Sequence, residues 1–344
     1  MELEQIGEFG LIKRIKTKVS ARAEGVRLGI DDDAAAFEPT RGLLTLLTTD
    51  CVVEGIHFDP GFARPYEIGW KAMAANLSDI AAMGGIPRIA VVSLCLPRET
   101  KVEWVEEVYA GMNELMGRFE GAIVGGDTSA SLHDTVITIA LCGEVESKRM
   151  TTRAGAQSGD IICVTGDLGG SVAGLKLLRK EGRGEGKTKE RWSHIIDKHL
   201  LPLPRIHEAR ILVAETKVNA MIDISDGLAS EIHHLCEMSQ TGAKLYLEEL
   251  PIHPQTAEIA QRHDGSAQQY ALYGGEDYEL LFTLSPKDVG DVFDIIAKET
   301  GTSVSVIGAM AEPGQGILLI DEQGRQQPVA FRGYNHFAER WIRQ

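Results

Sequence analysis

The sequence predicts a two-domain protein of mixed α/β (α+β) architecture, and three observations support this prediction. A chain of 344 residues is long for a single hydrophobic core. Segments with strand and helix patterns occur in mixed order along it. The polar, glycine-containing stretch 146–160 separates two sets of such segments, so we expect one domain over 1–148 and a second over 149–344.

The first domain is predicted to contain four strands and two helices. Apolar runs predict strands over 43–50, 89–96, 122–127 and 135–145. Apolar spacing predicts helices over 67–84 and 102–119, the second with Val105, Val108, Met112 and Leu115 on one face. Strands 89–96 and 135–145 are apolar at both parities, which is typical of strands covered on both faces. Helices can cover one face, and the other needs a domain or a partner chain.

The second domain is predicted to alternate strands and helices, followed by a tail of about thirty residues with weak strands. Strands are expected over 161–166, 220–225 and 278–284, and helices over 171–180, 227–238 and 287–299, with a polar loop over 181–190. The glycine-rich turn before residue 171 lacks the lysine of a Walker A motif. Its amide groups could cradle a phosphate, or the glycines could serve a tight strand–helix turn.

Composition limits the partners and the compartment. A net charge of −15 argues against nucleic acid or an anionic membrane as a partner. It leaves anionic ligands open, because bound metal ions invert the local field. Five single cysteines without a CxxC predict buried thiols and, with no signal-peptide pattern and no run long enough to span a bilayer, a cytoplasmic protein.

Acidic residues end or flank several of the predicted strands, and one interrupts a helix face. Asp79 lies on the stripe formed by Ile68, Ala72, Ala75 and Met83. The full set is Asp31, Asp32, Asp33, Asp50, Asp79, Asp127, Asp223, Asp226, Glu276 and Asp277. Each acid alone also fits a turn or a helix cap. Together, at strand ends where α/β proteins bind ligands, they favour Mg²⁺, whose shell is completed by water and nucleotide phosphates.

Three histidines are candidates for a role beside these acids. His57 follows the strand that ends at Asp50, and packing and function are equally consistent with that position. His233 and His234 are adjacent on a predicted helix, so their side chains should point in different directions. We assign no function to this pair.

Six segments, in order along nearly the whole chain, resemble motifs of the thiamine-monophosphate kinase family. They are TTDCVVEGIHF (48–58), NLSDIAAMGG (76–85), VGGDTS (124–129), IDISDGL (222–228), LYGGEDYELLF (272–282) and GYNHF (333–337). The superfamily includes aminoimidazole ribonucleotide synthetase, selenophosphate synthetase and a hydrogenase-maturation dehydratase. The chain lacks the reactive cysteines of the last two. It departs from the family pattern at GIDDDA (29–34), where Asp31 replaces a glycine and is expected to face solvent.

The resemblance implies ATP-dependent phosphorylation of thiamine monophosphate to thiamine diphosphate, by direct in-line transfer of the γ-phosphoryl group with several Mg²⁺ ions. It implies a homodimer in which two N-terminal four-stranded sheets form one barrel. The C-terminal α+β domain would contribute its tail to the substrate site. Because the acceptor is already an anionic phosphate, the reaction needs charge cancellation rather than a strong base.

The resemblance also assigns roles to individual residues. Metal ligands would be Asp33, Thr48, Thr49, Asp50, Asp79, Asp127, Asp223 and Asp226. ATP contacts would be Tyr109, Gly126, Asp127, Arg153 and Ser225, and substrate contacts would be His57, Glu276 and Phe331. Two alternatives stay open: another ATP-dependent enzyme of the superfamily, selenophosphate synthetase-like or hydrogenase-maturation-like, and a non-catalytic nucleotide-binding module.

Overall fold

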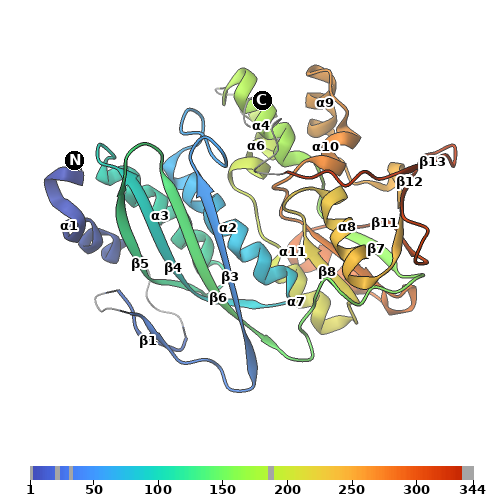
Figure 1. Ribbon diagram of the computed structural model, residues 1–344, viewed down its shortest axis with the longest axis horizontal. Coiled ribbons are helices and arrows are strands. Elements are labelled where there is room, and N and C mark those ends of the chain that lie inside the picture. Colours follow the sequence, from blue (N-terminus) through green and yellow to red (C-terminus); the bar gives the residue numbers. More distant parts are fainter. Residues whose placement is uncertain (1–2, 20–23, 31–33, 185–189, 335–344) are drawn as a thin grey trace. The chain divides into compact units, whose positions relative to one another are not determined.

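The computed structural model describes residues 3–19, 24–30, 34–184 and 190–334 (Figure 1). The chain forms two compact units. Unit 1 consists of Met1–Ile80 and Gly85–Lys148, and unit 2 of Ala81–Gly84 and Arg149–Gln344. Among the described residues, no helix is both long and apolar enough to cross a membrane.

Unit 1 is built on a four-stranded sheet of order β3-β6-β4-β5, antiparallel except for the parallel pair β4–β5. Its strands are β3 (Leu43–Val53), β4 (Ile86–Pro97), β5 (Ala122–Ser131) and β6 (Val136–Glu146). Its helices are α1 (Leu3–Lys18), α2 (Pro65–Ala82) and α3 (Val102–Gly117), and β1 (Val26–Leu28) pairs with β2 (Ala36–Phe37). The predicted strands and helices of this region are confirmed, with ends shifted by a few residues.

Helices α2 and α3 pack closely because glycines remove side chains from their contact. A Cβ atom at Gly69 would lie 1.9 Å from the carbonyl oxygen of Val108, and one at Gly111 would lie 1.9 Å from that of Tyr66. The predicted stripe of α3, from Val105 to Leu115, is fully buried. The contact fixes the position of α2, the helix that carries Asp79.

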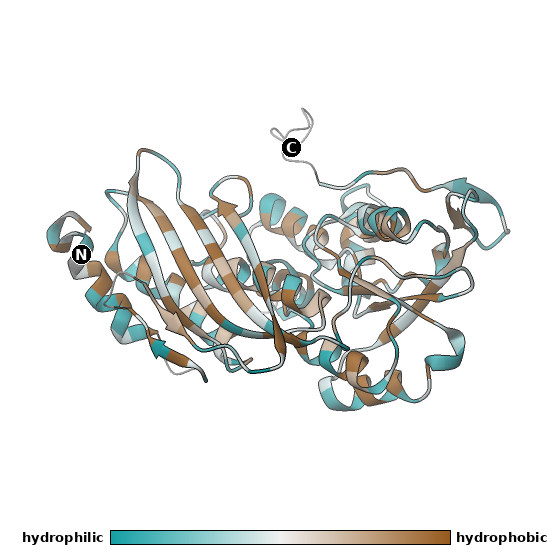
Figure 2. Ribbon diagram, turned by 60° about the horizontal axis from the view of Figure 1, so that its bottom comes forward, coloured by the Kyte–Doolittle hydropathy of each residue, from teal (hydrophilic) through white to brown (hydrophobic). Residues whose placement is uncertain are grey.

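The two faces of the four-stranded sheet differ in their cover. Ile80 of α2 reaches the sheet at Gly143, and Ile139 and Val92, which pair across β6 and β4, are fully buried on this side. On the other face, Leu47 is 79% exposed and Val91 is 39% exposed. Figure 2 shows hydrophobic and hydrophilic segments interleaved along these strands. The described residues of unit 1 therefore cover one face of the sheet well and the other incompletely.

Unit 2 is built on a seven-stranded sheet of order β13-β12-β9-β11-β7-β10-β8, antiparallel except for β12–β9. Its strands are β7 (Ile161–Thr165), β8 (Ala220–Asp223), β9 (Gly242–Tyr246), β10 (Leu280–Leu284), β11 (Val304–Ala311), β12 (Ile317–Ile320) and β13 (Gln326–Pro328). Its helices are α4 (Gly170–Glu181), α6 (Ser193–Leu200), α7 (Ile206–Glu215), α8 (Leu228–Ser239), α9 (Pro254–Arg262), α10 (Ala267–Tyr273) and α11 (Val292–Thr300). Short 3₁₀ turns span η1 (Leu247–Glu249) and η2 (Pro286–Asp288).

Some predictions for unit 2 need correction. The helix expected over 287–299 begins only at Val292, because Gly290 has a positive φ of 46° and separates it from η2. Strands β9 and β11 and helices α6, α7, α9 and α10 were not expected. Of the loop predicted over 181–190, residues 185–189 lie outside the described part of the chain.

The cysteine prediction is also only partly right. Cys163 and Cys236 are buried, whereas Cys95 and Cys142 are half-buried and Cys51 is exposed. Cys51 is exposed because it pairs with Thr138 on the incompletely covered face of the sheet.

Candidate functional site

Asp50 and Asp79 lie side by side in unit 1, one on β3 and the other on α2. Thr48, two residues before Asp50 and therefore on the same face of the strand, donates a hydrogen bond from Oγ1 to Oδ2 of Asp79. Burial, then the charge of Asp79 and a hydrogen bond with it, raise the pKa of Asp50 from 3.8 to about 7. Two carboxyl groups this close resist ionising together.

One oxygen atom of Asp50 stands out in this pair. Among the residues that the structure describes, no group forms a hydrogen bond with Oδ2 of Asp50, although this atom is buried. A buried carboxylate oxygen without a donor is costly, so the site fits a cation that the chain itself does not supply. The oxygens of Thr48, Asp50 and Asp79 are the ligand type that Mg²⁺ prefers.

The sheet register places Asp127 and Thr49, two other predicted residues, on the opposite face of the sheet from Asp50. Asp50 pairs with Ile139, which pairs with Val92 and then Gly126. Asp127 pairs with Ser93 and is exposed, so it lies on the opposite face of the sheet from Asp50. Thr49 is exposed too, and its Oγ1 donates to the carbonyl of Ile139 at 2.9 Å. A Cβ atom at Gly126 would lie 1.9 Å from the carbonyl oxygen of Val92, so only glycine fits there.

His57 is half-buried in the turn after β3. Its Nδ1 accepts a hydrogen bond from the N–H of Val53 at 3.0 Å, so the neutral ring carries its proton on Nε2. The ammonium group of Lys71, a lysine only 4% exposed, donates to the His57 carbonyl at 3.1 Å. The turn therefore holds the ring in one orientation.

Tyr109 lies in the core of unit 1 rather than at its surface. Its side chain is 4% exposed, and burial raises the pKa of its hydroxyl group. Asp33 lies outside the described residues.

Unit 2 brings together acids at the end of β8 and the start of α8. Asp223 is 4% exposed, and Ser225 and Asp226 follow in the bend that leads to the helix. Glu231, which no motif had indicated, is 3% exposed and accepts a hydrogen bond from the Asp226 N–H at 3.1 Å. Burial and then the charge of Asp223 raise the pKa of Glu231 to about 8, although the exposed Arg153 opposes this shift.

The glycine-rich turn before α4 binds a carboxylate of its own chain. Asp277 is 2% exposed, and its two oxygens accept from the N–H groups of Gly169, at 2.6 Å, and Ser171, at 3.1 Å. The partial positive charge of the helix N-terminus thus faces the carboxyl group of Asp277, whose pKa burial raises to about 7 against the opposing effect of Lys198 and of these N–H groups. Of the two interpretations left open by the sequence, the structure supports a tight strand–helix turn, because Asp277 occupies the amide groups that a phosphate would need.

A buried ion network around Glu279 lies next to Gly166, just before the glycine-rich turn. Glu279 is fully buried and contacts Nζ of Lys198 at 2.5 Å and Nε of Arg205 at 2.6 Å. Burial would raise the pKa of Glu279, but Arg205 and Lys198 outweigh it and hold that pKa below its usual value. Gly166 leaves space for this carboxylate, since a Cβ atom there would lie 2.2 Å from Glu279 Oε1.

The remaining two predicted residues lie at the surface of unit 2. Glu276 is half-buried, and its charge contributes to raising the pKa of Tyr334. Phe331 is 62% exposed, and its ring makes edge contacts with His233 and His234 at centroid distances of 5.3 and 5.6 Å. The Phe331 ring thus contacts both of these neighbouring histidines. Of GYNHF, residues 335–337 lie outside the described residues.

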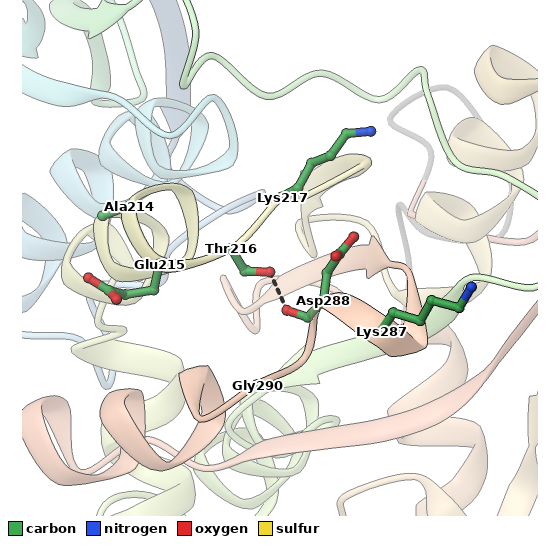
Figure 3. A pocket seen from close by; sticks show the side chains of 7 residues that line it. All are labelled: Ala214, Glu215, Thr216, Lys217, Lys287, Asp288 and Gly290. Carbon is green, nitrogen blue, oxygen red and sulfur yellow. Dashed lines mark hydrogen bonds between the residues drawn. The ribbon is translucent and has the colours of Figure 1, made fainter.

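No complete metal site exists within the described residues, where no three His, Cys, Asp or Glu side chains are placed to hold an ion. A surface hollow in unit 2 involves none of the predicted residues. It is formed by the end of α7 and the η2 region and lined by Ala214, Glu215, Thr216, Lys217, Lys287, Asp288 and Gly290 (Figure 3). It has mixed charges, and Thr216 Oγ1 donates to the Asp288 carbonyl within it.

Sequence reasoning missed Glu231, His199, Lys198 and Arg205. Glu231 is five residues from Asp226, and its position inside a helix beside an acidic motif was a usable signal. Lys198 and Arg205 contact Glu279 across 81 and 74 residues, and a single cation in α6 or just before α7 carries no local mark of such a partner.

Comparisons with known proteins identify the family of the chain. Residues 31–145 match the family model "AIR synthase related protein, N-terminal domain", and residues 157–321 match "AIR synthase related protein, C-terminal domain". The chain is 34% identical to the thiamine-monophosphate kinase of Bacillus subtilis (strain 168), over 96% of this chain and 99% of that protein.

The chain belongs to the thiamine-monophosphate kinase family.

Solved structures of the family share its fold. The thiamine-monophosphate kinase of Stenotrophomonas maltophilia K279a superposes with a TM-score of 0.82 at 31% identity, covering 94% of this chain and 98% of that one. The structure of AaThiL complexed with AMPPCP and TMP superposes with a TM-score of 0.75 at 33% identity, covering 98% and 99%. The expected two-domain architecture of this family is therefore confirmed.

Proposed function

We propose that this chain is an ATP-dependent kinase that converts thiamine monophosphate to thiamine diphosphate. The observation that carries the proposal is the half-buried pair Asp50 and Asp79, in the TTD and NLSD motifs of a kinase family. The Oδ2 atom of Asp50 is buried and has no hydrogen-bond partner among the described residues. The same activity is named for relatives that match nearly the whole chain, and one of these is complexed with a nucleotide analogue and TMP.

Magnesium is the cation that we assign to the acids. Thr48, Asp50 and Asp79 supply oxygen ligands in unit 1, and Asp223 and Asp226 supply them in unit 2. Each group is too small to enclose an ion, which suits Mg²⁺, since it binds one or two carboxylates and completes its shell with water and phosphate oxygens. Asp33, Thr49 and Asp127 are proposed as further ligands on the motif resemblance alone.

Bound magnesium would cancel the charge of two polyanions, ATP and the monophosphate acceptor. The residues of the chain hold the ions and orient the groups. We assign no general base, because the acceptor phosphate is already ionised at neutral pH. ATP contacts are proposed for Gly126, Asp127, Arg153 and Ser225. Tyr109 is buried in the core of unit 1, so we do not propose it as a direct ATP contact.

The substrate carries a cationic, flat thiazolium and an aminopyrimidine. Phe331 offers an exposed aromatic ring for stacking, and Glu276 offers a carboxylate for the positive charge or the amino group. His57, whose Nδ1 accepts a hydrogen bond from the N–H of Val53, is proposed as a further substrate contact on the motif resemblance.

We further infer a homodimer in solution. The incompletely covered face of the four-stranded sheet carries Leu47 and Val91, both exposed apolar residues, beside half-buried strand residues. A sheet of a second chain would cover this face, as the family barrel requires.

The test is an assay of ADP release by the purified chain with Mg²⁺, ATP and a panel of acceptors. Thiamine monophosphate should be the preferred acceptor, and Asp50→Asn or Asp79→Asn should each reduce the rate by at least about 100-fold. Two results would contradict the proposal. One is ADP release only with acceptors that other enzymes of the superfamily use, and the other is nucleotide binding without turnover. Near-normal turnover of Asp79→Asn at saturating Mg²⁺ would contradict the magnesium assignment.

A further inference from the structure

The backbone around Glu276 is strained. Glu276 and Tyr278 have positive φ angles of 64° and 51°, a conformation that costs energy for residues with side chains. Hydrogen bonds to the segment 224–225 hold it, from Glu276 N–H to the Ser225 carbonyl at 2.7 Å and from Tyr278 N–H to the Ile224 carbonyl at 2.9 Å. Glu276 is also the predicted substrate contact. Backbone strain that persists at such a residue indicates that its side chain must be placed accurately.

Asp277, which lies between the two strained residues Glu276 and Tyr278, anchors the turn through its buried side chain. The side chain of Asp277 is buried and takes the N–H groups of Gly169 and Ser171. Ser171 is itself only 1% exposed, so its backbone and its hydroxyl group have fixed positions.

Ser171 contacts His199, and His199 in turn contacts Glu276. The Ser171 Oγ lies 3.1 Å from Nδ1 of His199, and the same Nδ1 lies 3.7 Å from Oε2 of Glu276. His199 is 2% exposed. A lone pair on Nδ1 would face the Glu276 carboxylate, so the geometry favours a proton on Nδ1, which is donated to Ser171 Oγ and attracted by the charge of the Glu276 carboxylate.

We propose that His199 is a positioning residue, which fixes the Glu276 carboxylate for the substrate through a closed ring of contacts: Glu276–Asp277–Ser171–His199–Glu276. This role rests on the proposed function, since Glu276 is the assigned contact for the positive or amino group of thiamine monophosphate. His199 acts through Glu276 and touches no reacting atom. Its loss should therefore change substrate affinity and leave ATP affinity unchanged.

The variants separate positioning from packing. His199→Leu fills the buried space without a polar atom, whereas His199→Asn keeps an amide near the position of Nδ1. Ser171→Ala keeps the N–H that Asp277 binds and removes only the hydroxyl group that supports His199. His263→Leu is the matched control, because His263 Nε2 also lies near a glutamate, at 3.4 Å from Glu181 Oε1, at the ends of α9 and α4.

His199→Leu should raise the KM for thiamine monophosphate about fivefold, the scale of one lost hydrogen bond, with the KM for ATP unchanged. His199→Asn should recover most of this loss, and His263→Leu should show none. In a Glu276→Ala background, His199→Leu should have no further effect on the KM for thiamine monophosphate, because the carboxylate through which His199 acts is gone. Calorimetric titration of thiamine monophosphate without ATP should give the same ratios, and thermal melting checks that each variant is folded.

Two failures are distinguishable. If the unmodified chain neither binds thiamine monophosphate nor releases ADP with it, the proposed function is wrong. If the unmodified chain is active but folded His199→Leu has a normal KM, or changes the KM equally with and without Glu276→Ala, the positioning role alone is overturned. Ser171→Ala gives the same decision should His199→Leu fail to fold.

Discussion

At the scale of single residues, the Asp50–Asp79 pair makes stability depend on pH. The pKa of Asp50 is about 7 in the folded chain and 3.8 as its ordinary value, so between these values the folded state binds more protons than the unfolded state. Stability must then fall as the pH rises through this window. In metal-free buffer we expect a loss of up to about 4 kcal/mol from this group between pH 4 and pH 7.

Thermal and urea unfolding of the unmodified chain and of Asp50→Asn, at matched pH values, measure this loss. The variant should lack that part of the pH dependence, and an identical profile in both would contradict the coupling. Mg²⁺ should stabilise the unmodified chain more at pH 8 than at pH 5, because at pH 5 the ion must displace a proton from Asp50. Asp50→Asn should respond weakly to Mg²⁺ at both pH values.

Phe331 offers a second test at this scale. Its ring is mostly exposed, so Phe331→Ala should change the melting temperature little, while the KM for thiamine monophosphate rises about tenfold. The KM for ATP should stay the same. A lower melting temperature with an unchanged KM would mean that the ring only packs on His233 and His234.

At the scale of elements, the α2–α3 contact tolerates no side chain at Gly111. Gly111→Ala places a Cβ atom 1.9 Å from the Tyr66 carbonyl, so the helices must separate, and we expect a loss of about 1–3 kcal/mol in the free energy of unfolding. Gly117→Ala is the control on the same helix. No atom lies within 4 Å of the position that its Cβ atom would take, so the substitution should be neutral or slightly stabilising. Chemical denaturation compares them, and equal effects would contradict the close contact.

Elements with a long and regular pattern could be predicted from the sequence, and contacts between distant segments could not. The stripe from Val105 to Leu115 marked α3, and the TTD and NLSD motifs marked Asp50 and Asp79. In contrast, β9 has five residues and begins with glycine, so its apolar content is too small to stand out. The contact of Asp277 with the glycine-rich turn spans more than 100 residues, and no local pattern could indicate that this acid, rather than a phosphate, binds there.

At the scale of the whole molecule, the exposed face of the four-stranded sheet predicts the assembly state. Leu47→Glu would place a charge among the apolar residues of that face and disfavour its burial by a second chain. Sedimentation should show a dimer for the unmodified chain at low micromolar concentration and a monomer for Leu47→Glu. Leu203→Glu is the control, because Leu203 is an exposed leucine of unit 2, and it should leave the dimer intact. A monomeric unmodified chain would contradict the inference.

The Asp277 contact also sets an order in which unit 2 can fold. Strand β10 begins three residues after Asp277 and pairs between β7 and β8, so the carboxylate reaches the start of α4 only when this distant strand is in place. Contacts of such long sequence separation form late. The amide hydrogens of Gly169 and Ser171 should then gain protection from exchange together with β10, and a nascent chain that ends before residue 277 has no closed turn to support Glu276. The turn that carries Glu276 should therefore form during synthesis only after strand β10, which ends at Leu284, has been made.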